Sequence, residues 1–247
     1  MSSFVCVKTR KNKVVTQVET TTATMSDAKK TIEDNVLKCN DFDNLKELVS
    51  YYDETAIHYD KYVKDARGYI GPEVAASITA KFLKSQGFSE DCRILDVGSG
   101  TGLQAEGLVK HGFTNIDALD PSEKSNEVAR KKNLYKNYIT DYLEPGRKLN
   151  ISDGDYDAVA CVGVFTKGHV TAEAAMDEMV RVVRAEGLVC FTIREDVMFD
   201  TEYGYEAKMA ELCEKKYWEL VSHSLEPYHL AGNLEKCHMF VYKVCKH

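Results

Sequence analysis

A glycine-rich turn between an apolar strand and a helix constrains this chain more than any other stretch. It reads Leu95-Asp96-Val97-Gly98-Ser99-Gly100-Thr101-Gly102-Leu103. Three glycines at alternate positions let a backbone turn sharply and approach a ligand closely, as in doubly wound α/β folds. A P-loop would continue into Lys and Ser or Thr, and a dinucleotide loop would have the spacing G-x-G-x-x-G. Neither pattern is present, because Leu103 follows Gly102 and the third glycine comes one residue early.

The acid at the end of the strand indicates the charge of the ligand. Asp96 lies just before the loop. A carboxylate beside a pyrophosphate would be repelled by about 1 kcal/mol or more at partly screened distances, whereas a cation would be attracted. S-adenosylmethionine carries an α-ammonium and a sulfonium group, so Asp96 favours this ligand over NAD.

Two further acids follow the next two predicted strands. Asp120 ends the strand over 115–119, where an acid in doubly wound folds hydrogen-bonds the ribose hydroxyls of an adenosine. The alternative is that Asp120 or Ser122 caps the helix that follows. Asp141 ends the third strand and is a candidate partner for the adenine amino group, or else a turn aspartate.

Apolar strands alternate with helical stretches along the rest of the chain. The spacing predicts helices over 45–63, 74–83, 103–111, 122–132, 171–184 and 203–216. It predicts strands over 93–97, 115–119, 138–140, 156–164, 188–193, 218–222 and 237–244. The last two strands have no helix between them, which predicts an antiparallel hairpin. We therefore expect an α/β, Rossmann-like fold with a seven-stranded, mostly parallel sheet, helices on both faces and an antiparallel edge hairpin.

Composition and the N-terminal segment bear on partners and location. Residues 1–40 lack apolar periodicity, which predicts a disordered leader, with a weak mitochondrial transit peptide as the alternative. One folded domain is expected over 41–247, with N-terminal lid helices over 41–88 and a Rossmann-like core over 89–247. The formal net charge is −7 and the longest apolar run covers only 158–165, so neither nucleic acid nor a membrane is an expected partner. The 8 cysteines form no C-x-x-C pair, which fits a reducing, cytoplasmic setting.

This order of motifs resembles the class I S-adenosylmethionine-dependent methyltransferases. The signature D-x-G-x-G-x-G over 96–102 follows a strand, and an acid ends the next strand. The stretch Tyr52-Asp53-x-x-Ala56-x-x-Tyr59-Asp60 resembles the helix that lids the cofactor in many small-molecule members. From about residue 51 to 194 the chain is similar to the methyltransferase-like proteins of the Williams–Beuren syndrome region. The usual Pro-Gly-Gly turn reads Ala185-Glu186-Gly187 here, a departure that affects a turn and not the cofactor site.

The resemblance implies S-adenosylmethionine as cofactor, S-adenosylhomocysteine as product, and a set of residues around them. The residues that the resemblance places around the cofactor are Tyr59, Tyr69, Asp96, Gly98, Ser99, Gly100, Asp120, Ser122, Asp141, Tyr142 and Gly163. Thr101, Gly102 and Pro121 lie within or beside the same loops and complete the predicted cofactor site.

The acceptor would meet the methyl group where the strand over 156–164 ends. Residues 162–169 lack the Asn/Asp-Pro-Pro-Tyr sequence of enzymes that methylate exocyclic base nitrogens, and the Pro-Cys of pyrimidine-C5 enzymes. They fit small-molecule or protein acceptors instead. His169 is the candidate catalytic base, because histidine titrates near neutral pH. The alternatives are a neighbour of a helix cap or a surface-loop residue.

Four residues are candidates for binding the acceptor. Arg194 is expected to pair with an acidic substrate group, or else to form a surface ion pair with the acids that follow it. Tyr203 and Tyr228 belong to an aromatic cover over the acceptor, or else to the core or its rim. Phe165 ends the run of apolar residues before His169. No carboxylates cluster in 163–170, so no metal is expected.

We therefore expect an S-adenosylmethionine-dependent methyltransferase that acts on nitrogen or oxygen of a small molecule, as a monomer or homodimer. Two alternatives stay open: a protein methyltransferase, and a cofactor-binding scaffold protein without turnover.

Overall fold

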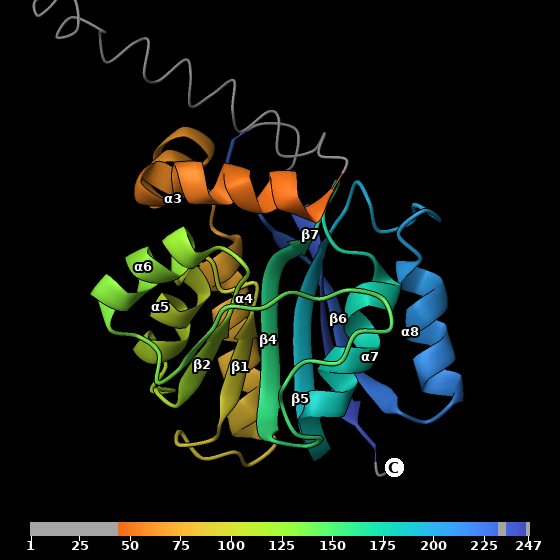
Figure 1. Ribbon diagram of the computed structural model, residues 1–247. Helices are drawn as coiled ribbons and strands as arrows, with labels where there is room; N and C mark the ends of the chain where they lie inside the picture. Colours follow the sequence, from red (N-terminus) through yellow and green to blue (C-terminus); the bar gives the residue numbers. More distant parts are fainter. Residues whose placement is uncertain (1–43, 232–235, 246–247) are drawn as a thin grey trace, which may run out of the picture. The chain divides into compact units, whose positions relative to one another are not determined.

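Figure 1 shows the computed structural model, which describes residues 44–231 and 236–245. The leader predicted over 1–40 lies outside the described residues. The helices are α3 (Leu45–Arg67), α4 (Gly71–Ser85), α5 (Leu103–Lys110), α6 (Glu123–Lys132), α7 (Ala172–Val182) and α8 (Tyr205–Glu214). The strands are β1 (Ile94–Val97), β2 (Ile116–Leu119), β3 (Tyr138–Ile139), β4 (Tyr156–Phe165), β5 (Val183–Arg194), β6 (Trp218–Pro227) and β7 (Lys236–Val244).

These strands form one sheet in the order β3-β2-β1-β4-β5-β7-β6. β1 pairs in parallel with β2 and β4, and β3 and β5 extend the parallel part on either side. β7 is antiparallel to both β5 and β6, which makes the edge hairpin. The predicted α/β fold is therefore confirmed. The direction of strand progression reverses between β1 and β4, and doubly wound sheets bind ligands beyond the carboxyl ends of the strands at such a point.

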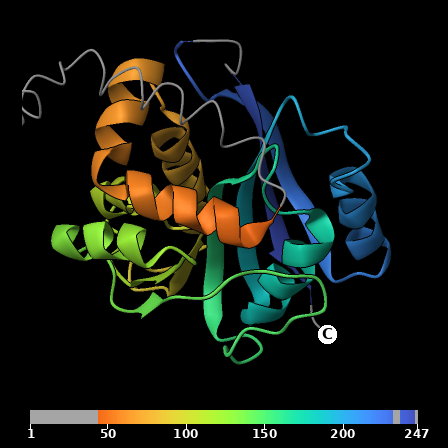
Figure 2. The same cartoon turned by 45° about the horizontal axis from the view of Figure 1, so that its top comes forward.

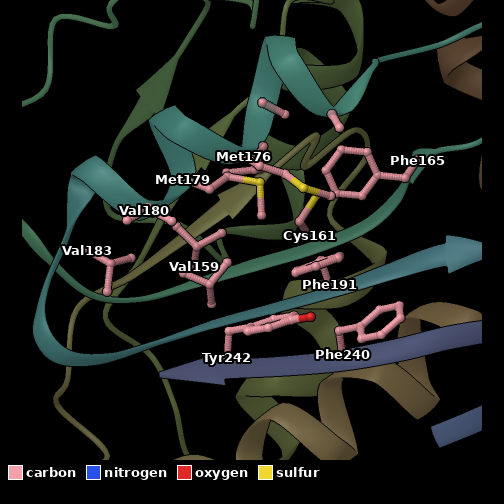
Figure 3. Close-up of a cluster of buried hydrophobic side chains, with 14 of the residues drawn as sticks. Val159, Cys161, Phe165, Met176, Met179, Val180, Val183, Phe191, Phe240 and Tyr242 are labelled. Atoms are coloured by element: carbon pink, nitrogen blue, oxygen red, sulfur yellow. The ribbon is translucent and has the colours of Figure 1, made fainter. Parts of the chain in front are cut away.

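Each face of the sheet buries its own hydrophobic layer, because successive strand residues point to opposite faces. Leu95 and Val97 of β1 face the layer covered by α7 and α8, in which Phe191 stacks against Tyr242. Figure 3 shows part of this layer, with methionines of α7 beside the aromatic rings of the strands. Ile94 faces the other layer, which α4 and α5 cover.

Two element ends differ from the sequence prediction for local reasons. α7 stops at Val182 instead of running to 184, because Val183 takes extended dihedrals (φ −93°, ψ 133°) and begins β5. β6 runs to Pro227 instead of ending at 222, because it pairs with β7 along its whole length. The part of β6 after Trp218 is exposed or half-buried along this outer edge, so its pattern carries little apolar signal.

α3 lies across the edge of the sheet at which β4 ends (Figures 1 and 2). The side chain of Asn44 caps its first turn by accepting a hydrogen bond from the backbone N–H of Glu47, and Gly68 ends it in the left-handed conformation (φ 57°). α4 belongs instead to the packed layer against α5 and the sheet, with Ala76 and Leu83 fully buried. Among the described residues, no helix has the length and apolarity needed to cross a membrane.

Candidate functional site

The glycine loop is held in shape by backbone hydrogen bonds to the end of β2. Gly98, Gly100 and Gly102 have φ values of 69°, 50° and 92°, a region that side-chain-bearing residues rarely adopt. The N–H groups of Gly98 and Ser99 donate to Leu119 O at 2.8 and 3.2 Å. The loop therefore curves back over β2 before α5 begins.

Asp120 is fixed at the wall of the cavity that this loop encloses. Its Oδ2 accepts from the N–H of Gly100 at 2.8 Å, and its Oδ1 accepts from the N–H of Ser122 at 2.8 Å. Burial raises its pKa to about 6, against the opposing effect of the two N–H donors. Ser122 is the residue that caps α6, by accepting from the N–H of Ser125 at 3.0 Å. Asp120 therefore lines the cavity, and the helix-cap role belongs to Ser122.

Asp96 lies behind the loop and does not line the cavity. It is 1% exposed and accepts a hydrogen bond from the Tyr135 hydroxyl at 2.7 Å. Burial raises its pKa to about 7, while the Tyr135 hydroxyl lowers it and the charge of Asp120 raises it further. A cation bound at the loop would stabilise the ionised form, so the predicted role of Asp96 depends on such a ligand.

Two aspartates two turns apart on α3 fasten this helix over the loop. Asp53 accepts from the Ser122 hydroxyl at 2.7 Å, where α6 begins. Asp60 accepts from the Thr101 hydroxyl and pairs with Lys132 Nζ at 2.5 Å. The aspartates of the Tyr-Asp repeat thus attach α3 to the loop and to both ends of α6. Tyr52 and Tyr59 of the same repeat line the cavity.

Two buried polar side chains in the cavity wall have no hydrogen-bond partner within the described residues. They are Ser99, through its Oγ, and Gln104, through both Nε2 and Oε1. Buried polar groups are nearly always paired, so these atoms point to a polar ligand. Gln104 offers a donor and an acceptor together, which suits the α-carboxylate and α-ammonium groups of an amino acid. Sequence reasoning missed Gln104, because a single amide between Leu103 and Ala105 has no distinguishing pattern.

The other end of the cavity is apolar. The aliphatic lining residues at this end are Leu45, Leu48 and Val49, which precede Tyr52 on α3, and Val170, which follows His169. The first turns of α3 supply three of them. Tyr52 and His169 place polar groups in this region.

His169 is a half-buried, hydrogen-bonded imidazole. Its Nδ1 lies 2.9 Å from Lys167 O, and its Nε2 lies 2.8 Å from Tyr52 Oη. Because a carbonyl can only accept, Nδ1 carries the proton and the lone pair of neutral Nε2 accepts from the tyrosine. Burial lowers the pKa of His169 to about 4, and the charge of Arg194 contributes in the same direction.

Tyr69 lines the cavity beside Gly163 of β4, and Tyr228 packs behind Tyr69. Their hydroxyls are 2.9 Å apart, and burial raises the pKa of both. Gly163 is required beside them, since a Cβ there would lie 2.8 Å from Tyr69 Oη. The ring of Tyr69 also stacks on His229, which joins the loop after β6 to the start of α4.

The structure brings most of the predicted site together. The predicted residues that line the cavity are Tyr59, Tyr69, Gly98, Ser99, Gly100, Thr101, Asp120, Pro121, Ser122, Asp141, Tyr142, Gly163 and His169. Asp96 and Gly102 lie just outside this lining. The roles of all these residues toward a ligand stay predictions.

The four residues predicted to bind the acceptor are not part of the cavity lining. Phe165 is 1% exposed in the core. Arg194 pairs with Asp196 through two hydrogen bonds. Tyr203 accepts from Gly168 N at 2.7 Å, and Tyr228 packs behind Tyr69. These side chains lie outside the cavity lining, and their roles toward an acceptor stay predictions.

Among the described residues, no three His, Cys, Asp or Glu side chains gather as a metal site would require. The loop, the fixed acid after β2 and the strand order instead define a nucleoside-cofactor site on a Rossmann-like sheet. Residues 95–191 match the family described as "Methyltransferase domain". The chain is 30% identical to human methyltransferase-like protein 27 over 194 residues, which is 77% of this chain and 76% of that protein. It belongs to this family of class I methyltransferases, with S-adenosylmethionine as cofactor.

Other similarities are shorter or more distant. Mouse EEF1A lysine methyltransferase 2 is 35% identical over 81 residues, 28% of this chain and 33% of that one. The ubiquinone biosynthesis O-methyltransferase of Dechloromonas aromatica (strain RCB) is 37% identical over 76 residues, 28% of this chain and 31% of that one. The solved structure of magnesium protoporphyrin IX methyltransferase from Synechocystis PCC 6803, with bound SAH, superposes with a TM-score of 0.51 at 15% identity. That superposition covers 72% of this chain and 84% of that one, and it shows the shared fold.

Proposed function

We propose that this protein transfers a methyl group from S-adenosylmethionine to oxygen or nitrogen of a small-molecule acceptor. The observation that carries the proposal is one cavity with two chemically different ends. One end has the glycine loop, Asp120 and the unpaired polar atoms of Ser99 and Gln104. The other end is lined by aliphatic side chains under α3.

The residues at the polar end fit the cofactor. Gln104 and Ser99 would hold its amino-acid part, and Asp120 would accept from its ribose hydroxyls. When bound, S-adenosylmethionine supplies a methyl group on a sulfonium, and the carbon–sulfur bond breaks with its electron pair on sulfur. The chain contributes alignment and the exclusion of water. α3 excludes water because Asp53 and Asp60 fasten it across the loop.

The aliphatic lining of the apolar end supports a small acceptor over the lysine side chain of a protein. A lysine side chain is cationic, and the acids that line the cavity within the described residues are Asp120 and Asp141. Asp120 is engaged by two backbone N–H groups, and Asp141 pairs with Arg147 at 2.6 Å. Neither lies among the aliphatic residues where the acceptor would sit. Protein methylation is the second candidate function, because the chain is also similar to a lysine methyltransferase.

Incubation with S-adenosylmethionine labelled in its methyl group tests the proposal. The purified protein is mixed with a metabolite extract in one arm and with a protein extract in the other. We expect label in small solutes, and we expect its loss in the Asp120→Asn variant. Label that enters only protein would favour the second candidate. Binding of S-adenosylhomocysteine without any transfer would favour a scaffold protein.

A further inference from the structure

The apolar end of the cavity contains one hydrogen-bonded pair, Tyr52 and His169, that no proposed cofactor contact uses. Tyr52 comes from α3, and His169 comes from the loop between β4 and α7. Their rings meet edge to face with centroids 5.9 Å apart. Both side chains line the cavity, as do Leu48 and Val49 from the turn before Tyr52 and Val170 next to His169. The pair is therefore assembled from two distant segments at the place where an acceptor would lie.

The backbone oxygen of Lys167 fixes which atoms of Tyr52 and His169 donate and which accept. Lys167 O can only accept, so the proton of the neutral imidazole is on Nδ1. Nε2 then has a lone pair, and the Tyr52 hydroxyl donates to it across 2.8 Å. A phenol oxygen that donates its proton in this way still accepts hydrogen bonds. Tyr52 Oη can thus accept from a hydroxyl group in the cavity, whereas His169 Nε2 is covered by Tyr52.

We propose, on the basis of the function proposed above, that Tyr52 is the catalytic residue that contacts the acceptor, that His169 receives its proton, and that the acceptor is a largely apolar alcohol or phenol. The acceptor O–H proton moves to Tyr52 Oη while the tyrosine proton moves to His169 Nε2. The electron pair of the broken O–H bond stays on the acceptor oxygen, which uses it for the new bond to the methyl carbon. The imidazolium, with protons on both nitrogens, then releases one to water.

The surroundings of the pair select the rest of the acceptor. The aliphatic residues of α3 and of the loop after β4 favour an apolar body. An ammonium group would find no carboxylate among the described residues that line this end. A neutral hydroxyl needs only an acceptor for its proton, which Tyr52 provides. The charged group that faces His169 from β5 is Arg194, and this guanidinium is already paired with Asp196.

Turnover of matched acceptors tests the assignment. The probes are alkyl-substituted phenols and their aniline counterparts, with labelled S-adenosylmethionine, at saturating concentrations of both substrates. We expect methylation of the phenols in preference to the anilines. Tyr52→Phe should lower kcat by about 10²- to 10⁴-fold, the usual contribution of a general base, with the Kd for S-adenosylhomocysteine within twofold. Tyr62→Phe is the matched control, because it makes the same change on the same helix outside the cavity lining.

The role of His169 has its own readouts. In His169→Ala the tyrosine has no base to receive its proton, so kcat should fall by about 10²- to 10⁴-fold while the Kd for S-adenosylhomocysteine stays within twofold. The unaltered protein should have a kcat that is flat between pH 6 and pH 8. Nitrogen-15 NMR of the unliganded protein should show neutral His169 with its proton on Nδ1, and Tyr52→Phe should shift the Nε2 resonance.

Three results would overturn the assignment while leaving the proposed function in place. They are anilines methylated as fast as phenols, Tyr52→Phe with the kcat of Tyr62→Phe, and an Nε2-protonated tautomer of His169. Binding of S-adenosylhomocysteine with neither phenol nor aniline methylated would also overturn the acceptor class. Failure to bind S-adenosylhomocysteine at all would overturn the proposed function itself.

Discussion

Asp96 and Asp120 are two buried carboxylates that lie close to each other at the glycine loop. The charge of Asp120 raises the pKa of Asp96, and burial raises the pKa of both. Within the part of the chain that the structure describes, neither group forms an ion pair with a cationic side chain. Ionising either carboxyl group therefore costs free energy in the unliganded protein. A cationic ligand bound nearby lowers this cost.

The contribution of Asp96 to the stability of the unliganded protein should become more favourable as pH falls from 8 to 6, whereas His169, whose pKa is lowered by burial, contributes in the opposite direction. The pKa of Asp96 is about 7 in the folded state and about 3.9 in an unfolded chain. The folded state therefore takes up the proton first, which adds about 1 kcal/mol to the free energy of unfolding over this interval. Chemical denaturation at pH 8, 7 and 6 measures the change. In Asp96→Asn this contribution should be lost, and an identical pH dependence in the variant would contradict the assignment.

Affinity for S-adenosylhomocysteine should change in the opposite direction. The ligand keeps its α-ammonium group, and it favours the ionised forms of Asp96 and Asp120, whose pKa values are about 7 and about 6. Lowering the pH from 8 to 5.5 should weaken binding by about tenfold or more, because protons then compete with the ligand. Titration calorimetry across this range tests it. A Kd that does not vary with pH would mean that neither acid responds to the ligand.

At the scale of single residues, the sequence identified the acids and glycines because their order along the chain reflects the ends of adjacent strands. Gln104 and the aliphatic residues of the acceptor end lack such an order. The four residues predicted to bind the acceptor lie outside the cavity lining, because their side chains pack in the core or form hydrogen bonds and an ion pair. Arg194, for example, follows a buried strand and turns to Asp196 and to Thr166 Oγ1.

At the scale of elements, α3 covers the glycine loop and contributes part of the cavity wall. Its position depends on Asp53 and Asp60, because these acids contact Ser122, Thr101 and Lys132. Apolar spacing predicted this helix, and the resemblance of its Tyr-Asp repeat to the family's lid helix implied its position over the cofactor. The extent of β6 was not predictable in the same way, because pairing with β7 rather than its own apolar pattern sets where it ends.

Removing both attachments should loosen α3 without unfolding the sheet. We expect Asp53→Ala/Asp60→Ala to weaken binding of S-adenosylhomocysteine by about 30-fold, since two hydrogen bonds to charged groups are lost, each worth about 1 kcal/mol or more. Hydrogen exchange should become faster over 45–67 and stay unchanged in β4 and β5. Asp65→Ala is the control, because Asp65 is exposed on the same helix. Unchanged exchange in α3 of the double variant would show that other contacts hold the helix.

At the scale of the whole molecule, the side chains that stabilise the fold lie on the faces of the sheet, whereas the site lies at the ends of its strands. The layer under α7 and α8 contains Phe191, which stacks against Trp218, Phe240 and Tyr242 and is fully buried. The site occupies the strand ends instead. The alternation of apolar strands with helices predicted this architecture, because a parallel sheet that helices cover on both faces is built from mostly apolar strands.

Truncating this aromatic stack should lower stability and spare the site. Phe191→Ala is expected to reduce the free energy of unfolding by about 3–5 kcal/mol, the usual loss for a buried phenylalanine. At a temperature where the variant is folded, its affinity for S-adenosylhomocysteine should stay within twofold of that of the unaltered protein. Denaturant unfolding and calorimetry measure the two quantities. A large loss of affinity in a folded variant would mean that the core and the site are coupled.

Titration calorimetry of the purified protein with S-adenosylhomocysteine at pH 7.5 measures whether the glycine loop and Asp120 bind the cofactor. We expect saturable binding of one ligand per chain. We also expect an affinity about 10- to 100-fold lower in Asp120→Asn, because that carboxylate offers a charged acceptor to the ribose. The absence of any binding heat at high micromolar ligand, or equal affinity in the variant, would contradict the assignment of the cofactor site.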